Sequence, residues 1–210
     1  MKKYPIIFVL TILFCHKATA QGTINDITKT YFRSDPFDKD FSKFLTHLLN
    51  DPTLINKTLI KRTDTNFFYF KGQYTLHNPF SYKAIRTEVI LAETEIQITD
   101  SIPQTDTILL YQLLGYTKEG KQGYEETRKE FNKFKRKFGD YFLNMDSKEL
   151  TKNNQVVGTI SDFYSPFNLI SPLTIAWAIF SQSDENVFAI TIRIKVKENI
   201  AMLPETPDRF

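Results

Sequence analysis

The sequence predicts an α+β fold: an antiparallel sheet of about six or seven strands built from hairpins, with two amphipathic helices on one face. Two observations predict it. Apolar runs of strand length follow one another with turn sequences between them, whereas only two segments show the apolar spacing of a helix. Strands that run from hairpin to hairpin, without regular crossover helices, are typical of α+β rather than α/β proteins.

The first twenty residues have the three parts of a cleavable export signal. Lys2 and Lys3 form a basic start, residues 6–15 are an almost unbroken apolar run, and Ala18 and Ala20 are the small residues that a signal peptidase reads. An apolar run of this length is too short for a membrane span, which needs about 20 apolar residues.

Cleavage is therefore expected before Gln21, leaving a single α+β domain over residues 21–198 and a C-terminal tail over residues 199–210. We expect the protein to be exported, either to the periplasm or out of the cell, with no membrane span in the mature chain.

Removal of residues 1–20 changes the charge and the cysteine content. The 27 basic residues lose three lysines, which leaves 24 basic and 24 acidic residues, and the only cysteine is lost as well. A neutral chain lacks the basic excess on which binding to nucleic acid depends, so no nucleic-acid partner is expected. Without cysteine there is no disulfide or thiolate site, so the core must hold the domain together, and 19 Phe and 10 Tyr can supply it.

The first predicted helix lies near the start of the mature chain. Ser34 or Asp35 can cap it, Pro36 suits the first helical position, and Phe and Leu recur at helical spacing over residues 37–49. Pro52 ends it.

The second helix is predicted over residues 124–138. Phe131, Phe134 and Phe138 form its apolar face, and six Lys and Arg cover most of the remainder. Acids in its first turns, among them Glu130, complement the helix dipole and pair with these cations. We interpret the basic run as the solvated face of a structural helix in preference to a docking surface for an acidic partner or a glycan.

Seven strands are predicted, at residues 57–62, 67–75, 83–98, 107–116, 155–164, 172–180 and 187–197. The last one alternates well, with Arg193 and Lys195 among the residues expected to point away from the core. Residues 21–33 and 144–154 are polar and are expected to be irregular.

Two turns resemble each other. Pro79-Phe80 and Pro166-Phe167 each follow a strand and precede another, with an offset of 87 residues. One interpretation is a tandem duplication of an α-β-β-β unit, with a concave sheet or a cleft between the halves. The other is that Pro-Phe after a strand is an ordinary turn with a core anchor.

Catalytic and metal-binding equipment is sparse. Only His47 and His77 remain after cleavage, and no G-x-S-x-G elbow accompanies them, so no catalytic residue is assigned. Two histidines without cysteine do not suggest a zinc site, and no glycine-rich phosphate loop is present, so no metal or cofactor is expected. Glu93 and Glu95 share a strand face next to Glu88, which we interpret as a solvated sheet surface.

These observations favour a non-enzymatic exported protein that binds another protein or a small ligand, neither of which the sequence identifies. Two alternatives stay open. A carboxylate-based hydrolase requires two close, buried carboxylates in a cleft, or His77 beside an acid. A curved-sheet binder of a lipid or aromatic molecule requires an internal cavity lined by Phe and Leu.

Overall fold

The computed structural model describes residues 24–36, 41–61, 68–97, 105–142, 144–164, 171–182 and 185–197. The expected export signal with Ala18, Ala20 and Gln21, the second Pro-Phe turn and the C-terminal tail all lie outside these residues.

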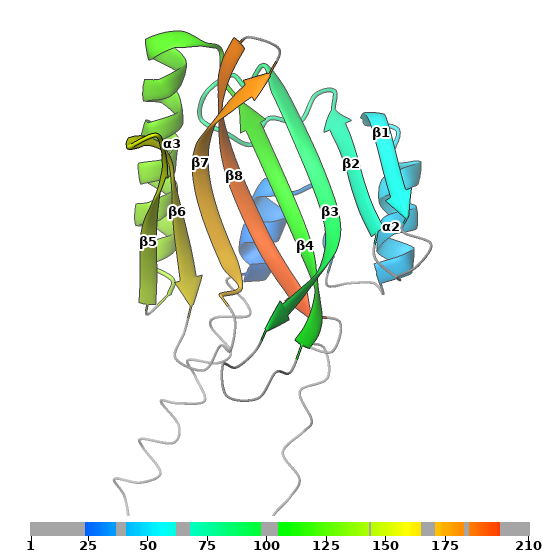
Figure 1. Ribbon diagram of the computed structural model, residues 1–210. Helices are drawn as coiled ribbons and strands as arrows, with labels where there is room; N and C mark the ends of the chain where they lie inside the picture. Colours follow the sequence, from blue (N-terminus) through cyan, green and yellow to red (C-terminus); the bar gives the residue numbers. More distant parts are fainter. Residues whose placement is uncertain are drawn as a thin grey trace, which may run out of the picture.

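The described chain is an α+β fold with one eight-stranded antiparallel sheet and three helices, which confirms the predicted class (Figure 1). A first helix over residues 24–31 is followed by α2 (Phe41–Asn50), β1 (Leu54–Lys61), β2 (Phe68–Tyr74), β3 (Arg86–Gln97), β4 (Thr105–Tyr116), α3 (Gly120–Gly139), β5 (Asn144–Lys152), β6 (Gln155–Tyr164), β7 (Leu173–Gln182) and β8 (Glu185–Lys197).

The strand order is β1-β2-β3-β4-β8-β7-β6-β5. Each half of the sheet is therefore a four-stranded meander preceded by a helix, and the two halves meet where β4 pairs with β8. The junction is a regular antiparallel ladder from Ile108↔Lys197 to Tyr116↔Ala189, so the two meanders form one continuous sheet.

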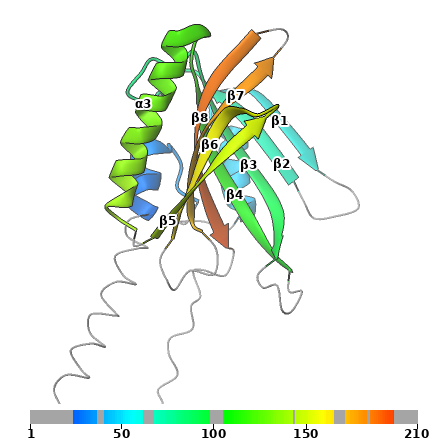
Figure 2. The same cartoon turned by 60° about the vertical axis from the view of Figure 1, so that its left-hand side comes forward.

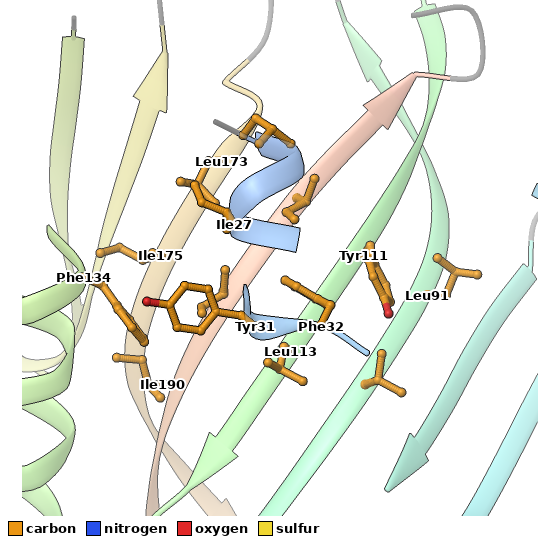
Figure 3. Close-up of a cluster of buried hydrophobic side chains, with 14 of the residues drawn as sticks. Ile27, Tyr31, Phe32, Leu91, Tyr111, Leu113, Phe134, Leu173, Ile175 and Ile190 are labelled. Carbon is orange, nitrogen blue, oxygen red and sulfur yellow. The ribbon is translucent and has the colours of Figure 1, made fainter. Parts of the chain in front are cut away.

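All three helices contribute to one apolar core on one face of the sheet (Figure 2). The buried side chains come from the first helix (Ile27, Tyr31), from α2 (Phe44, Leu48), from α3 (Phe134, Phe138) and from alternate positions of the strands (Phe70, Leu91, Tyr111, Leu113, Phe163, Ile175, Ile190, Ile192). Figure 3 shows the first helix lying across the middle of the sheet, with Ile27, Tyr31 and Phe32 directed into the cluster.

Aromatic rings fill this layer. The rings of Phe32 and Phe44 lie 4.4 and 5.1 Å from that of Tyr111, and Tyr31 meets Phe134 edge to face at 5.2 Å. Rings at these separations attract one another in addition to the area they bury. The chain therefore forms the aromatic core that its composition predicts.

Two segments expected to be irregular have regular structure. The polar lead-in of residues 21–33 contains the first helix, whose Ile24, Ile27 and Tyr31 are buried. That prediction was wrong because three apolar residues at helical spacing are a weak signal between polar neighbours. The expected polar loop 144–154 is strand β5 and the turn into β6, with Asn153 and Asn154 at positive φ in the turn.

The bounds of the two main helices also differ from expectation in detail. Residues 34–36 are not helical, and the described part of α2 begins at Phe41. The second helix extends over Gly120–Gly139, longer than the predicted 124–138. Its apolar face is as predicted, since Phe131, Phe134 and Phe138 are buried.

Candidate functional site

The face of the sheet opposite the helices carries no helix in the described part of the chain, and we call it the open face (Figure 1). Side chains on a strand alternate between faces, so the residues next to the buried core positions point to the open face. On β8, for example, Ile192 and Ile194 lie in the core, whereas Thr191, Arg193 and Lys195 point outward, as predicted.

One row of paired residues crosses the open face on all eight strands. In order from β1 to β5 along the sheet, it consists of Thr58, Lys71, Ile90, Gln112, Arg193, Thr174, Asp162 and Asp146. Strands lie about 4.8 Å apart, so seven spacings make this row roughly 34 Å wide. We call it the polar row, because Ile90 is its only apolar member.

Two cations are half-buried in the middle of this face. Lys195 Nζ lies 4.0 Å from Asp162 Oδ1, and that carboxylate also accepts a hydrogen bond of 2.5 Å from Thr174 Oγ1. Arg193 is the neighbour of Gln112 and Thr174 in the polar row, and its Nε is buried without a hydrogen-bond acceptor.

Burial has an electrostatic cost for this pair. It lowers the pKa of the Arg193 guanidinium, which nearby Asp162 partly opposes. It also lowers the pKa of Lys195, again opposed by Asp162 and reinforced by the charge of Arg193. Asp162 thus faces two desolvated cations, and it is itself engaged by Thr174. The centre of the open face is therefore short of negative charge.

A second cluster on the open face is internally compensated. Glu88 is 3% exposed and receives Arg86 Nε at 3.0 Å, Lys71 Nζ at 3.1 Å and the Tyr116 hydroxyl at 2.9 Å. The Arg86 guanidinium also lies 4.1 Å over the ring of Tyr116. The prediction of a solvated acidic surface was therefore wrong for Glu88, because its cations come from neighbouring positions and strands and allow the carboxylate to be buried.

Apolar side chains border the two clusters. The row that contains Lys195 continues through Leu110, Ala92, Tyr69 and Ile60 on the neighbouring strands. Ile60 is 55% exposed, and the other four are partly buried. On the far side of the polar row, Phe180 is also exposed. An uncovered apolar surface around buried charges is typical of a binding face.

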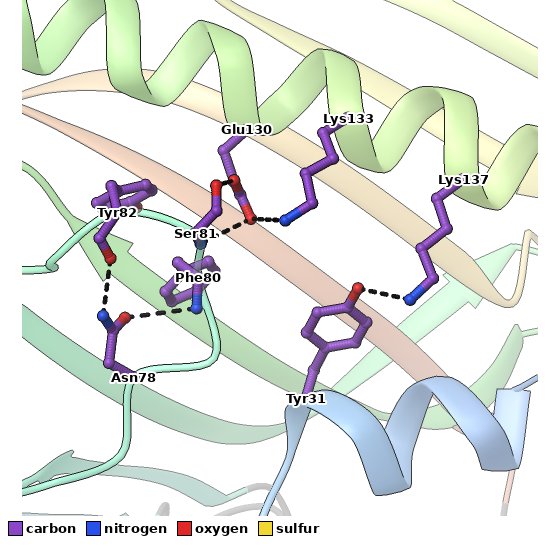
Figure 4. Close-up of polar contacts among 8 residues, drawn as sticks. All are labelled: Tyr31, Asn78, Phe80, Ser81, Tyr82, Glu130, Lys133 and Lys137. Carbon is purple, nitrogen blue, oxygen red and sulfur yellow. Dashed lines mark hydrogen bonds and ion pairs between the residues drawn. The ribbon is translucent and has the colours of Figure 1, made fainter.

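The first Pro-Phe turn is a core anchor on the helix face (Figure 4). Phe80 and Tyr82 are buried, and their rings stack at 5.6 Å. Asn78 Nδ2 donates to the Tyr82 carbonyl, and the Tyr82 hydroxyl donates to the Gly115 carbonyl. This confirms the interpretation of the first turn as a structural anchor.

Glu130 fastens this turn to α3. Its carboxylate accepts hydrogen bonds from the backbone N–H and the hydroxyl of Ser81 and lies 3.4 Å from Lys133 Nζ (Figure 4). Glu130 is completely buried. The sequence-based view of it as a helix-surface acid was therefore incomplete, because a loop 49 residues away in the chain covers it.

His47 and His77 do not meet a nucleophile in the described contacts. His77 Nε2 donates to the Tyr31 carbonyl at 2.7 Å, and its ring contacts Tyr74. Burial lowers the pKa of His77. His47 is exposed on α2. His77 therefore ties the turn to the first helix.

The carboxylates in the described part of the chain do not form a buried pair either. Glu88 lies on the open face and Glu130 on the helix face, so the sheet separates them. Asp146 and Asp162 are cross-strand neighbours, but Asp146 is exposed and Asp162 is 40% exposed. Glu93 is half-buried, and the side chain of Glu95 lies outside the described part.

Among the described residues, no group of three His, Cys, Asp or Glu is placed to hold a metal ion. None of the described helices combines the length and apolarity that crossing a bilayer requires. No protein-family model matches the sequence, and comparison with curated proteins and with solved structures finds no match.

Proposed function

We propose that this chain is an exported, non-enzymatic binding protein that docks a protein partner on its open face. In this proposal an acidic side chain of the partner enters between Arg193 and Lys195 and accepts the free Nε–H of Arg193. The observation that carries the proposal is this half-buried cation pair, for which Asp162 is the one counter-charge among the described residues.

The charge balance favours an anionic contact group. A buried donor without an acceptor costs about 1–3 kcal/mol, and more when the donor is charged. A carboxylate from a partner removes that cost, and it binds a guanidinium in the planar geometry that arginine prefers. Arg193 thus lowers the stability of the free chain, and this cost is removed when a partner's carboxylate binds.

The dimensions favour a protein over a small molecule. The polar row is roughly 34 Å wide, and apolar side chains border it on both sides, whereas small-molecule sites are compact concavities of about 300–1,000 Å³. A protein interface has the same organisation of an apolar area with a few buried charged anchors.

Each half of the chain is a helix followed by a four-stranded meander, and we infer from this arrangement that the chain is a tandem duplication. The cation pair lies on β8, where the two halves meet. Equivalent strands β4 and β8 pair at the junction, and Gln112 lies opposite Arg193 there. A unit of four strands after each helix replaces the α-β-β-β unit suggested by the sequence.

The two alternative functions have less support. A hydrolase of the glycosidase type needs two carboxylates whose environments separate their pKa values. Glu88 and Glu130 are held by cations and hydroxyls on opposite faces of the sheet. A lipid binder needs an internal cavity, whereas rings pack against one another between the helices and the sheet.

The test is affinity capture from the extract of the native host with three baits. Wild-type chain should retain one stoichiometric protein, Arg193→Met should lose at least tenfold of it, and Arg128→Met, which removes an exposed cation from α3, should retain it. Equal retention by Arg193→Met would refute the docking mode. Recovery of no protein, with turnover of a generic glycan or ester by the purified chain, would favour the enzyme.

Export is tested separately by N-terminal sequencing of the protein isolated from its host. A mature chain that begins at Gln21 supports the proposed periplasmic or extracellular location. Intact residues 1–20 on the isolated protein would contradict it.

A further inference from the structure

Strand β5 is an unusually accessible edge of the sheet. It is the last strand in the sheet order, and eight of its nine residues are exposed, Leu150 alone being half-buried. Figures 1 and 2 show no further strand beside it among the described residues. One side of its backbone is therefore available to pair with another strand.

The opposite edge, β1, is protected. A bulge interrupts it between Ile55 and Thr58, with Asn56 at φ 50°. Lys57 Nζ turns back to the carbonyls of Leu49 and Asp51 at 2.7 and 2.6 Å. Bulges of this kind blunt an edge against strand addition. In β5, by contrast, the ladder with β6 is regular from Asn144 to Leu150.

We propose that β5 pairs antiparallel with β5 of a second copy of this chain, in the register that places Ser147 opposite Ser147 of the partner subunit. In a two-fold symmetric antiparallel pair, one residue must face its own copy, because side chains alternate between the faces. The sequence of β5 allows only a few choices of that residue.

Charge selects among these choices. Centring the pair on Asp146, Lys148 or Glu149 sets identical charges opposite each other, and centring it on Leu150 opposes Lys148 to Lys152 of the partner subunit. A centre at Met145 or Thr151 overlaps only three residues of the strand.

Centring on Ser147 instead opposes Asp146 to Lys148 of the partner subunit, and symmetry makes this contact twice. The Tyr164 hydroxyl, 2.7 Å from Asp146 Oδ2, holds that carboxylate on the open face. The two-fold axis is perpendicular to the sheet, so both open faces lie on the same side of the dimer. The dimer is independent of whether the open face binds the partner proposed above.

The test is sedimentation equilibrium of the purified chain and of charge variants over a concentration series. Asp146→Lys sets four lysines along the contact and Lys148→Asp sets four aspartates, so each should weaken the dimer roughly tenfold to a hundredfold. The double variant D146K/K148D restores opposite charges in this register and should recover the dimer.

An equimolar mixture of the two single variants should also dimerise, because each lysine then faces an aspartate of the other chain. Glu125→Lys and Lys121→Asp, which change the exposed pair on α3 in the same way, serve as matched controls and should leave the dimer intact. Circular dichroism of each variant establishes that it is folded.

Wild-type protein that stays monomeric through 100 µM, a concentration on the order of those at which weak homodimers assemble, would overturn the proposal and assign the β5 charges to protection of the edge. Single variants that dimerise like wild type, or a double variant and a mixture that do not recover, would overturn the register.

Discussion

Gly115 lies in β4 directly beneath the Phe80–Tyr82 stack, and replacing it tests whether this turn is the anchor of the sheet. A Cβ built at this position meets Phe80 Cε2 at 2.3 Å and Cδ2 at 2.5 Å, and the Tyr82 hydroxyl oxygen at 2.8 Å. Carbon atoms pack at about 3.5–4.0 Å, so the Phe80 ring must retreat by more than an ångström.

The ring has little room to move. Phe80 stacks on Tyr82 and lies 6.3 Å from the ring of Phe134, which is itself completely buried. Overpacking of this kind costs about 1–3 kcal/mol, and displacement of Tyr82 also breaks its hydrogen bond to the Gly115 carbonyl, worth about 0.5–1.5 kcal/mol. Gly115→Ala should therefore lower the free energy of unfolding by about 2–4 kcal/mol.

The assay is urea unfolding followed by the fluorescence of Trp177, the only tryptophan, which is buried against Tyr124. Gly139→Ala is the matched control, because a Cβ there meets nothing within 4 Å and the position is helical. It should be neutral or stabilise by up to about 1 kcal/mol. A Gly115→Ala protein within 0.5 kcal/mol of wild type, on the scale of ordinary surface substitutions, would refute the packing argument.

Three further predictions follow from the polar contacts. Glu130→Ala removes the buried carboxylate that accepts both hydrogen bonds from Ser81 and should cost about 2–3 kcal/mol in urea unfolding, whereas Glu130→Gln keeps one acceptor and should cost less; equal losses would contradict the role of the hydrogen bonds. Because burial lowers the pKa of His77 below its ordinary 6.5, the unfolded chain binds the proton more readily, so stability should fall as pH drops through 6.5; His77→Asn should remove that component of the pH dependence, and an unchanged slope would contradict it. Arg193→Met should leave the free energy of unfolding unchanged or raise it by up to about 1 kcal/mol while it lowers partner capture at least tenfold, and a loss above 1 kcal/mol would assign Arg193 to folding.

The open face shows how much of a site can be predicted from the sequence of a single strand. Alternation in β8 correctly predicts that Arg193 and Lys195 point away from the core. Their half-burial and their shared counter-ion depend on strands that lie 31 and more residues away in the sequence, at Asp162 and Gln112. Only the pairing of β8 with β4 and β7, together with that of β7 with β6, brings these residues together.

The sequence by itself determined the fold class, the apolar faces of α2 and α3, and seven of the eight strands, because the spacing of apolar residues along the chain follows the periodicity of a buried helix or strand face. It did not reveal the first helix or β5. The burial of the first helix depends on its packing against α3 and the sheet, and β5 has no buried face to impose a period. Tertiary structure also decided that Glu88 and Glu130 are buried, since a carboxylate can be buried only when cations or hydrogen-bond donors, here partly from distant segments, contact it.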